Sequence, residues 1–115
     1  MDTRARKQKG KLLQRRVRDD LLKLDPDGGY GSQIMGQAGS DIVDPFDRLP
    51  VNYVECRNHK GFPSLNSIKI EMDHKGKSRW FAILKANRQD PVVLMPYQVW
   101  INLMYFYLTH CSVGT

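Results

Sequence analysis

The chain has 115 residues, which is enough for one folded domain with one modest core. Charged residues make up 26% and hydrophobic residues 41%, a composition that excludes a disordered chain. Eighteen Lys and Arg against twelve Asp and Glu give a formal charge of +6, which favours a polyanionic partner such as nucleic acid.

Membrane and secretory classes find no support in the sequence. No apolar run approaches the roughly 20 residues of a membrane span, and no apolar signal core follows the basic N-terminus. We therefore expect a soluble, intracellular protein. Cys56 and Cys111 lack metal-ligand or CxxC spacing and are interpreted as reduced thiols.

The chain begins with a basic stretch and continues into a helical pattern. Residues 1–10 are predicted to be a flexible, basic N-terminal lead, either contacting an anionic partner or only aiding solubility. Residues 11–115 are predicted to form a single domain. From Lys11 an amphipathic helix is expected, ended by "DPDGG" at residues 25–29. Its apolar face would carry Leu13, Val17, Leu21 and Leu24.

A glycine-rich segment follows, "GGYGSQIMGQAGSD", whose spacing fits neither a P-loop nor a dinucleotide-binding motif. It is interpreted as a short strand over residues 32–35 followed by a turn. A second strand is expected over residues 41–43, and the prolines and aspartates of residues 44–50 predict a loop.

The stretch "VNYVECR", residues 51–57, is the clearest strand. Its alternation places Val51, Tyr53, Glu55 and Arg57 on one face, and Asn52, Val54 and Cys56 on the other. Glu55 and Arg57 are therefore expected to point the same way.

The remaining elements are predicted from apolar spacing. Ser64 is a plausible N-cap for a helix over residues 64–75, and "RWFAILK" and "PVVLM" predict two buried strands joined by the turn "ANRQD". The last segment, "YQVWINLMYFYL", predicts a helix with apolar residues around nearly its whole circumference. This indicates either a homodimer through the C-terminal helix or a deeply buried terminal helix.

Together these elements predict an α/β domain, with a central mixed sheet of about five strands flanked by helices. The expected order is αβββαβ with a C-terminal helix.

The positions of two carboxylates, Asp41 and Glu55, need a physical explanation. Glu55 lies in an otherwise apolar strand, where an ionised side chain is costly unless a cation or metal compensates it. A hairpin can bring Asp41 to the same end of the sheet. A divalent hard cation such as Mg²⁺ would relieve the repulsion, and it could generate a hydroxide for phosphodiester hydrolysis. Arg57 lies on the right face to stabilise developing negative charge.

The segments "MGQAGSDIV" and "VECRNHK", in this element order, resemble the PD-(D/E)xK nuclease superfamily, in particular phage and archaeal Holliday junction resolvases. The likeness extends roughly over residues 9–100. It implies a restriction-endonuclease-like core, with Asp41 and Glu55 as metal ligands and the Cys56 carbonyl as the backbone ligand. Mg²⁺, with Mn²⁺ able to substitute, would be the cofactor.

The chain departs from that pattern at two positions. Arg57 stands where the family has its catalytic lysine, and arginine stays charged, so it cannot act as a base. Lys60 or Lys69 could substitute, although each could equally be a plain phosphate contact. Gln14 stands where relatives carry a glutamate, and a neutral amide brings no charge to the metal.

Further residues are expected to contact DNA. The basic lead and first helix would bind phosphates in a salt-dependent manner. The polar residues before Asp41 and beside the strand would lie near the scissile phosphate, or else be ordinary turn residues. The set is Arg4, Arg6, Lys7, Lys9, Lys11, Arg15, Arg18, Ser32, Gln37, Ser40, His59, Lys60 and Lys69.

The resemblance implies a homodimeric, metal-dependent endonuclease acting on branched or duplex DNA, with a phage-encoded role in recombination in the host cytoplasm. Two alternatives remain open: a nuclease-fold DNA-binding protein whose catalysis is weakened or lost, and a small assembly protein whose basic charge is incidental.

Overall fold

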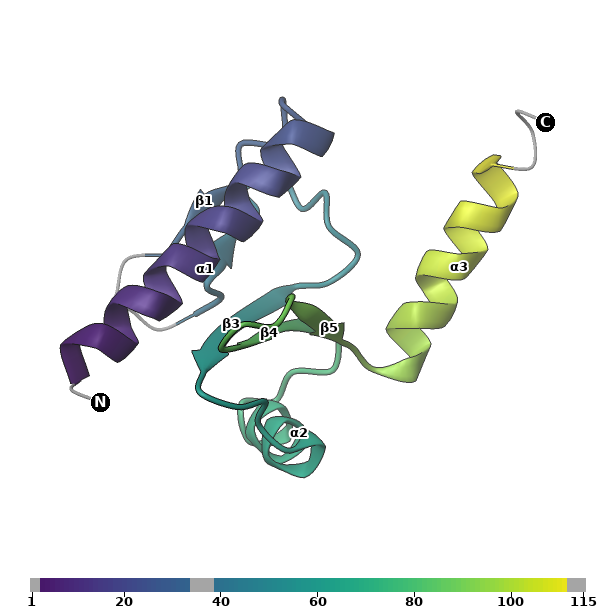
Figure 1. Cartoon of the computed structure of the whole chain (residues 1–115). Coiled ribbons are helices and arrows are strands. Elements are labelled where there is room, and N and C mark those ends of the chain that lie inside the picture. The colour runs from purple at the N-terminus through teal and green to yellow at the C-terminus, as the bar shows by residue number, and fades with distance from the viewer. Residues whose placement is uncertain (1–2, 34–38, 112–115) are drawn as a thin grey trace.

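The computed structural model describes residues 3–33 and 39–111, with side chains for 9–33 and 39–110. Three helices and five strands appear in the described part of the chain (Figure 1). In order they are α1 (Thr3–Leu24), β1 (Gly31–Ser32), β2 (Ile42–Val43), β3 (Tyr53–His59), α2 (Leu65–His74), β4 (Trp80–Ala86), β5 (Val92–Leu94) and α3 (Tyr97–Cys111). The α/β class is confirmed.

The five-strand central sheet is not confirmed. Strands β3, β4 and β5 form a mixed three-stranded sheet, and β1 and β2 form a separate antiparallel pair. Strand β3 is parallel to β4 across the α2 crossover, with Tyr53 opposite Trp80 and His59 opposite Ala86. Strand β5 runs antiparallel to β4. The β1 and β2 strands are only two residues long, too short to extend the sheet by a regular ladder.

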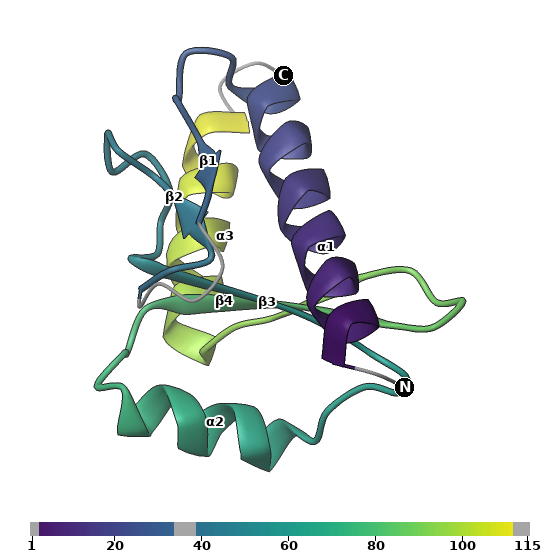
Figure 2. The same ribbon diagram turned by 90° about the vertical axis from the view of Figure 1, so that its left-hand side faces the viewer.

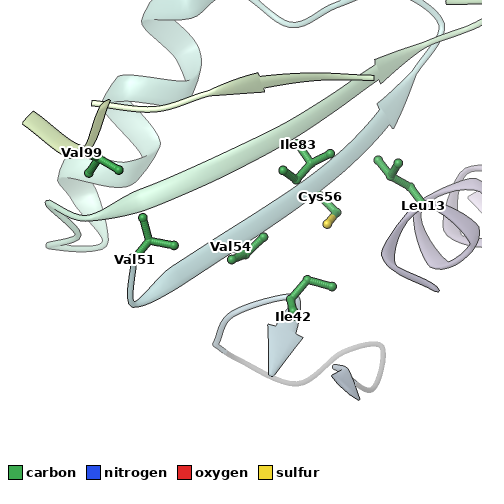
Figure 3. Packing of buried hydrophobic residues seen from close by; sticks show 7 residues of the cluster. All are labelled: Leu13, Ile42, Val51, Val54, Cys56, Ile83 and Val99. Carbon is green, nitrogen blue, oxygen red and sulfur yellow. The ribbon is translucent and has the colours of Figure 1, made fainter. Parts of the chain in front are cut away.

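The three-stranded sheet lies between two helices, with α1 on one face and α2 on the other (Figure 2). On the α1 face, Val54 and Cys56 of β3 pack in one cluster with Leu13 (Figure 3). On the α2 face, Tyr53 packs with Ile68 and Met72. Strand alternation therefore puts Glu55 and Arg57 on one face, as the sequence predicts, and this is the face that α2 covers.

Val51 does not follow this alternation. It is buried in the cluster on the α1 face, beside Val54, because β3 begins only at Tyr53. The sequence-based assignment of Val51 to the face of Glu55 is wrong.

Helix α1 is longer than the sequence pattern suggests. It begins at Thr3 instead of Lys11, so residues 3–10 are helical. Apart from Gly10, this stretch contains no helix breaker, and its Ala, Arg, Lys and Gln residues favour a helix. Leu13 is buried and Val17 and Leu21 pack against the same cluster, whereas Leu24 at the last helical position is 84% exposed.

The second helix begins where its cap predicts. The Ser64 hydroxyl accepts a hydrogen bond from the backbone N–H of Ser67, which satisfies one of the free donors of the first turn. Ile68 and Met72 are buried, as the spacing predicts, while Leu65 is exposed.

Strand β5 and helix α3 form the exposed end of the molecule. Val92 and Val93 are about half exposed, because β5 is an edge strand of the sheet, so the expected buried strand is wrong here. Helix α3 stands away from α1 and α2 (Figure 1), with Val99 buried in the core and Leu103 packed against it. The radius of gyration is 15.0 Å, whereas a domain of this length typically has about 13 Å. No helix in the described residues could cross a membrane on its length and hydropathy.

Candidate active site

One edge of β3 pairs with β4, and no strand pairs with the other edge in the described part, which we call the open edge. The side chains of two residues that precede β2 accept hydrogen bonds from this open edge. The backbone N–H of Val54 donates to Ser40 Oγ at 2.8 Å, and the N–H of Cys56 donates to Asp41 Oδ2 at 2.8 Å. The Asp41 N–H donates to the Val54 carbonyl, also at 2.8 Å. Two side-chain oxygens and one backbone N–H thus bond this edge of β3, and they hold the Asp41 carboxylate beside it.

The Cys56 carbonyl belongs to the same edge. In a strand, the N–H and C=O of one residue point towards the same side. Because the Cys56 N–H points to Asp41, its carbonyl oxygen also faces the Asp41 side. The thiol lies instead in the core on the α1 face, and burial raises its pKa well above the usual range, so it stays neutral.

Glu55 is buried, with 8% of its surface exposed, and lies between two cations. The guanidinium of Arg57 donates from Nε and Nη2 to Glu55 Oε1, at 3.0 and 2.8 Å. The ammonium of Lys75 lies 3.6 Å from Glu55 Oε2. These charges compensate the desolvation of Glu55, which a lone buried carboxylate could not tolerate.

Glu71 of α2 and Lys75, the C-cap residue that follows this helix, complete the cluster, and the sequence motifs point to neither. Arg57 Nη2 also donates to Glu71 Oε1, and Lys75 Nζ lies 3.8 Å from the same oxygen. Lys75 also donates to the Tyr53 hydroxyl at 3.0 Å. The spacing did carry a signal: Glu71 and Lys75 are four residues apart and share the helix face of Ile68 and Met72.

The charges of this cluster act on Asp41. Burial raises the pKa of Asp41, and the charge of Glu55 raises it as well. The hydrogen bond from the Cys56 N–H and the charges of Lys75 and Arg57 lower the pKa, but the net shift is upward.

The pKa of Lys75 is also raised. Burial lowers it, but the Tyr53 hydrogen bond and the nearby carboxylates raise it more. Both cations therefore stay charged at neutral pH. Three carboxylates face two cations, and the cluster has a formal charge of −1.

The donor set fits a hard cation in its chemistry. Asp41, Glu55 and the Cys56 carbonyl supply oxygen, and Mg²⁺ binds through one or two carboxylates with water and phosphate oxygens completing its shell. Within the described ranges no group of three or more His, Cys, Asp or Glu is placed to hold a metal ion. Arg57 bonds Glu55 Oε1 and Lys75 lies 3.6 Å from Oε2, so a metal at Glu55 would compete with these cations for the carboxylate.

The other residues expected at the site are spread more widely. Gln14 is buried, and its side-chain oxygen accepts from the Ser32 hydroxyl at 3.4 Å; no hydrogen bond to Asp41 or Glu55 is found in the described part. The Ser40 hydroxyl bonds backbone groups of β2 and β3, which makes it a structural group. Gln37 lies outside the described residues.

The expected phosphate contacts are mostly on the surface. Lys11 and Arg15 are exposed on α1, whereas Arg18 pairs with Asp19 at 2.9 Å and Lys9 donates to Asn87 at 3.1 Å. The side chains of Arg4, Arg6 and Lys7 lie outside the described part.

The two expected lysine substitutes do not reach the cluster. Lys60 and Lys69 are exposed, as is His59, and neither lysine forms an ion pair with a described residue. Lys75 is the lysine that contacts Glu55.

A cavity of about 450 Å³ adjoins Ser40 and Tyr53, but Asp44 and Asp47 also line it. Their charges would repel a phosphate, so this cavity does not extend the site towards an anionic substrate.

Comparison with protein-family models, with curated proteins and with solved structures finds no match to this chain.

Proposed function

We propose that this chain is a metal-dependent DNA endonuclease that hydrolyses phosphodiesters of branched DNA, with Asp41, Glu55 and the Cys56 carbonyl as ligands of Mg²⁺ or Mn²⁺. The observation that carries the proposal is the bond from the Cys56 N–H to Asp41. It holds the Asp41 carboxylate beside β3 next to the backbone of Cys56, close enough to Glu55 for the two charges to interact.

Each residue has a role that its chemistry supports. A bound divalent cation would lower the pKa of a water and neutralise charge on the phosphodiester. Arg57 and Lys75 are charged donors on the same face of β3, so they can orient a phosphate oxygen and stabilise negative charge that builds up on it. Neither is proposed as the base, since both hold their protons at neutral pH.

DNA binding would rest on the first helix. Lys11, Arg15 and Arg18 recur at intervals of four and three residues, and therefore lie along one side of α1. Lys11 and Arg15 are exposed and unpaired in the described part. Such a row fits the phosphates of one strand and supports binding that weakens with salt.

A second copy of the chain would complete the assembly. Helix α3 exposes Tyr105, Phe106, Tyr107 and Leu108, each by 59% or more. A helix that buries one stripe needs no further apolar residues unless a partner covers them. A homodimer would present two sites, which paired cuts in a four-way junction require. The likeness to Holliday junction resolvases of phage type is consistent with this arrangement.

The experiment is cleavage of a labelled four-way junction in Mn²⁺. We expect discrete products from the native chain and none from Asp41→Ala. Asp90→Ala is the control: it removes an aspartate from the exposed turn between β4 and β5, and this variant should cleave like the native chain. Products that persist in Asp41→Ala would refute the proposal.

A second candidate is a DNA-binding protein that retains this fold without cleavage. The observation that favours it is the engagement of Glu55 by both Arg57 and Lys75, which already satisfies the carboxylate without a metal. Tight retention of the junction with no product at any Mn²⁺ concentration would support this function. Weak, salt-insensitive binding would instead favour an assembly role.

A further inference from the structure

The two cations of the cluster are each shared between two carboxylates. Arg57 donates to Oε1 of both Glu55 and Glu71. Lys75 lies 3.6 Å from Glu55 and 3.8 Å from Glu71. Neither cation therefore depends on Glu55 alone for its partner.

This sharing matters if Glu55 binds a metal, which is the premise taken from the proposed function. Arg57 bonds Glu55 Oε1 and Lys75 lies near Oε2, so a divalent cation that binds either oxygen repels a cation already there and weakens its contact with Glu55. Leaving a half-buried guanidinium without a partner is unfavourable, because it loses both water and its counter-charge. A second acceptor within reach removes this obstacle.

We infer that Glu71 is a positioning residue that receives Arg57 and Lys75 when Glu55 turns to the metal. Its place on α2 suits this role, because α2 covers one face of the sheet whereas Asp41 bonds the open edge of β3. The Glu71 side chain is 32% exposed, compared with 11% for Glu55, so it tolerates its charge in either state.

Removing the Glu71 charge should weaken metal binding. Without it, Glu55 is the one carboxylate of the described residues that still pairs with Arg57 and Lys75, and both cations compete with the metal for it. Loss of an outer partner of a metal ligand typically weakens metal affinity by about 10- to 100-fold. We expect Glu71→Gln to show a loss of this size.

The test is Mn²⁺ binding without DNA, followed by the electron paramagnetic resonance signal of free Mn²⁺. The full chain, Glu71→Gln and Asp41→Asn are compared. Asp73→Asn is the matched control, since it removes a charge of the same sign from an exposed position of α2. Glu71→Asp keeps the charge on a shorter side chain and should restore much of the affinity. Circular dichroism confirms that each variant is folded, and Glu71→Ala, which also removes the charge, replaces Glu71→Gln if the latter does not fold.

The outcomes separate the two claims. Tight binding by the native chain with weak binding by Glu71→Gln, and no change in Asp73→Asn, supports the inference. Equal binding by the native chain and Glu71→Gln overturns it and leaves the metal site intact. Should the native chain bind Mn²⁺ no better than Asp41→Asn, the proposed metal site fails, and the role of Glu71 fails with it.

Discussion

The Asp41 carboxylate is held where its charge is unfavourable. Burial raises its pKa and so does the charge of Glu55, while the hydrogen bond from Cys56 opposes them. A raised pKa means that the folded chain binds this proton more tightly than the unfolded chain does. Ionised Asp41 therefore costs stability above its folded-state pKa, and the cost falls as the pH drops below that value and is gone below the ordinary value of 3.8.

Replacing Asp41 with asparagine should stabilise the fold. The amide oxygen still accepts the Cys56 hydrogen bond, and the repulsion from Glu55 is gone. We expect the free energy of unfolding at pH 7 to rise by up to about 1 kcal/mol. The difference from the native chain should shrink as the pH falls towards the ordinary aspartate value of 3.8. Urea unfolding across this range measures it, and a variant that is less stable at pH 7 would contradict the account.

Lys75 and Lys77 provide a paired comparison at the same site. Both ammonium groups lie over the Tyr53 ring, at 5.2 and 5.3 Å, but only Lys75 also reaches Glu55. Replacing Lys75 with methionine should lower the cleavage rate by about 100-fold, the size of effect seen when one stabilising donor is removed. Lys77→Met should change the rate far less. Junction affinity is measured alongside, and equal rate losses in both variants would exclude a specific role for Lys75.

Helix α1 is expected to determine the salt dependence of DNA binding. Removing the cation that neutralises one phosphate should reduce the slope of log affinity against log salt by about 0.9. Replacing Lys11 and Arg15 with glutamine should therefore lower the slope by nearly two units. Lys23→Gln, at the exposed far end of the same helix, serves as the control. An unchanged slope in the double variant would place the DNA elsewhere.

Apolar spacing predicts most elements because it reports local burial. It finds the three helices and the strands β3 and β4, where side chains alternate between two covered faces. It fails for β5, whose apolar run "PVVLM" looks buried, since no local pattern reveals that the strand lies at the sheet edge. It also fails for the five-strand sheet, because the side chains of Ser40 and Asp41 bond β3 in place of a longer β2.

The site could be predicted in part, because strand alternation is a local pattern. Strand alternation alone places Glu55 and Arg57 on one face, and their ion pair follows from it. The pairing of Arg57 with Glu71 is not local, because it depends on the crossover that lays α2 over β3. Sequence proximity pointed instead to Lys60 and Lys69, which are exposed and unpaired in the described part.

At the scale of the whole molecule, α3 is the surface that a partner would cover. The molecule measures 51 Å along its longest axis, and α3 exposes large apolar side chains near its end. We expect light scattering to give twice the 13.3 kDa mass of one chain. Phe106→Glu with Leu108→Glu should return it to a monomer, whereas Asn102→Glu, already polar and exposed, should not. A monomeric native chain would exclude the dimer.

The net charge of the molecule and the charge of the Asp41 and Glu55 cluster have opposite signs. A net charge of +6 would favour approach to DNA, yet the cluster that contains Asp41 and Glu55 carries a formal charge of −1 that would repel a phosphate. The proposed divalent cation would change the sign of the cluster and let the DNA backbone approach.

A crystal soaked in Mn²⁺, with anomalous diffraction recorded, tests this account most directly. We expect an anomalous peak at about 2.1 Å from oxygens of Asp41, Glu55 and the Cys56 carbonyl, with Arg57 released from Glu55 and still bonded to Glu71. Density showing Glu55 still bound by Arg57 and Lys75, with no peak beside Asp41, would contradict it.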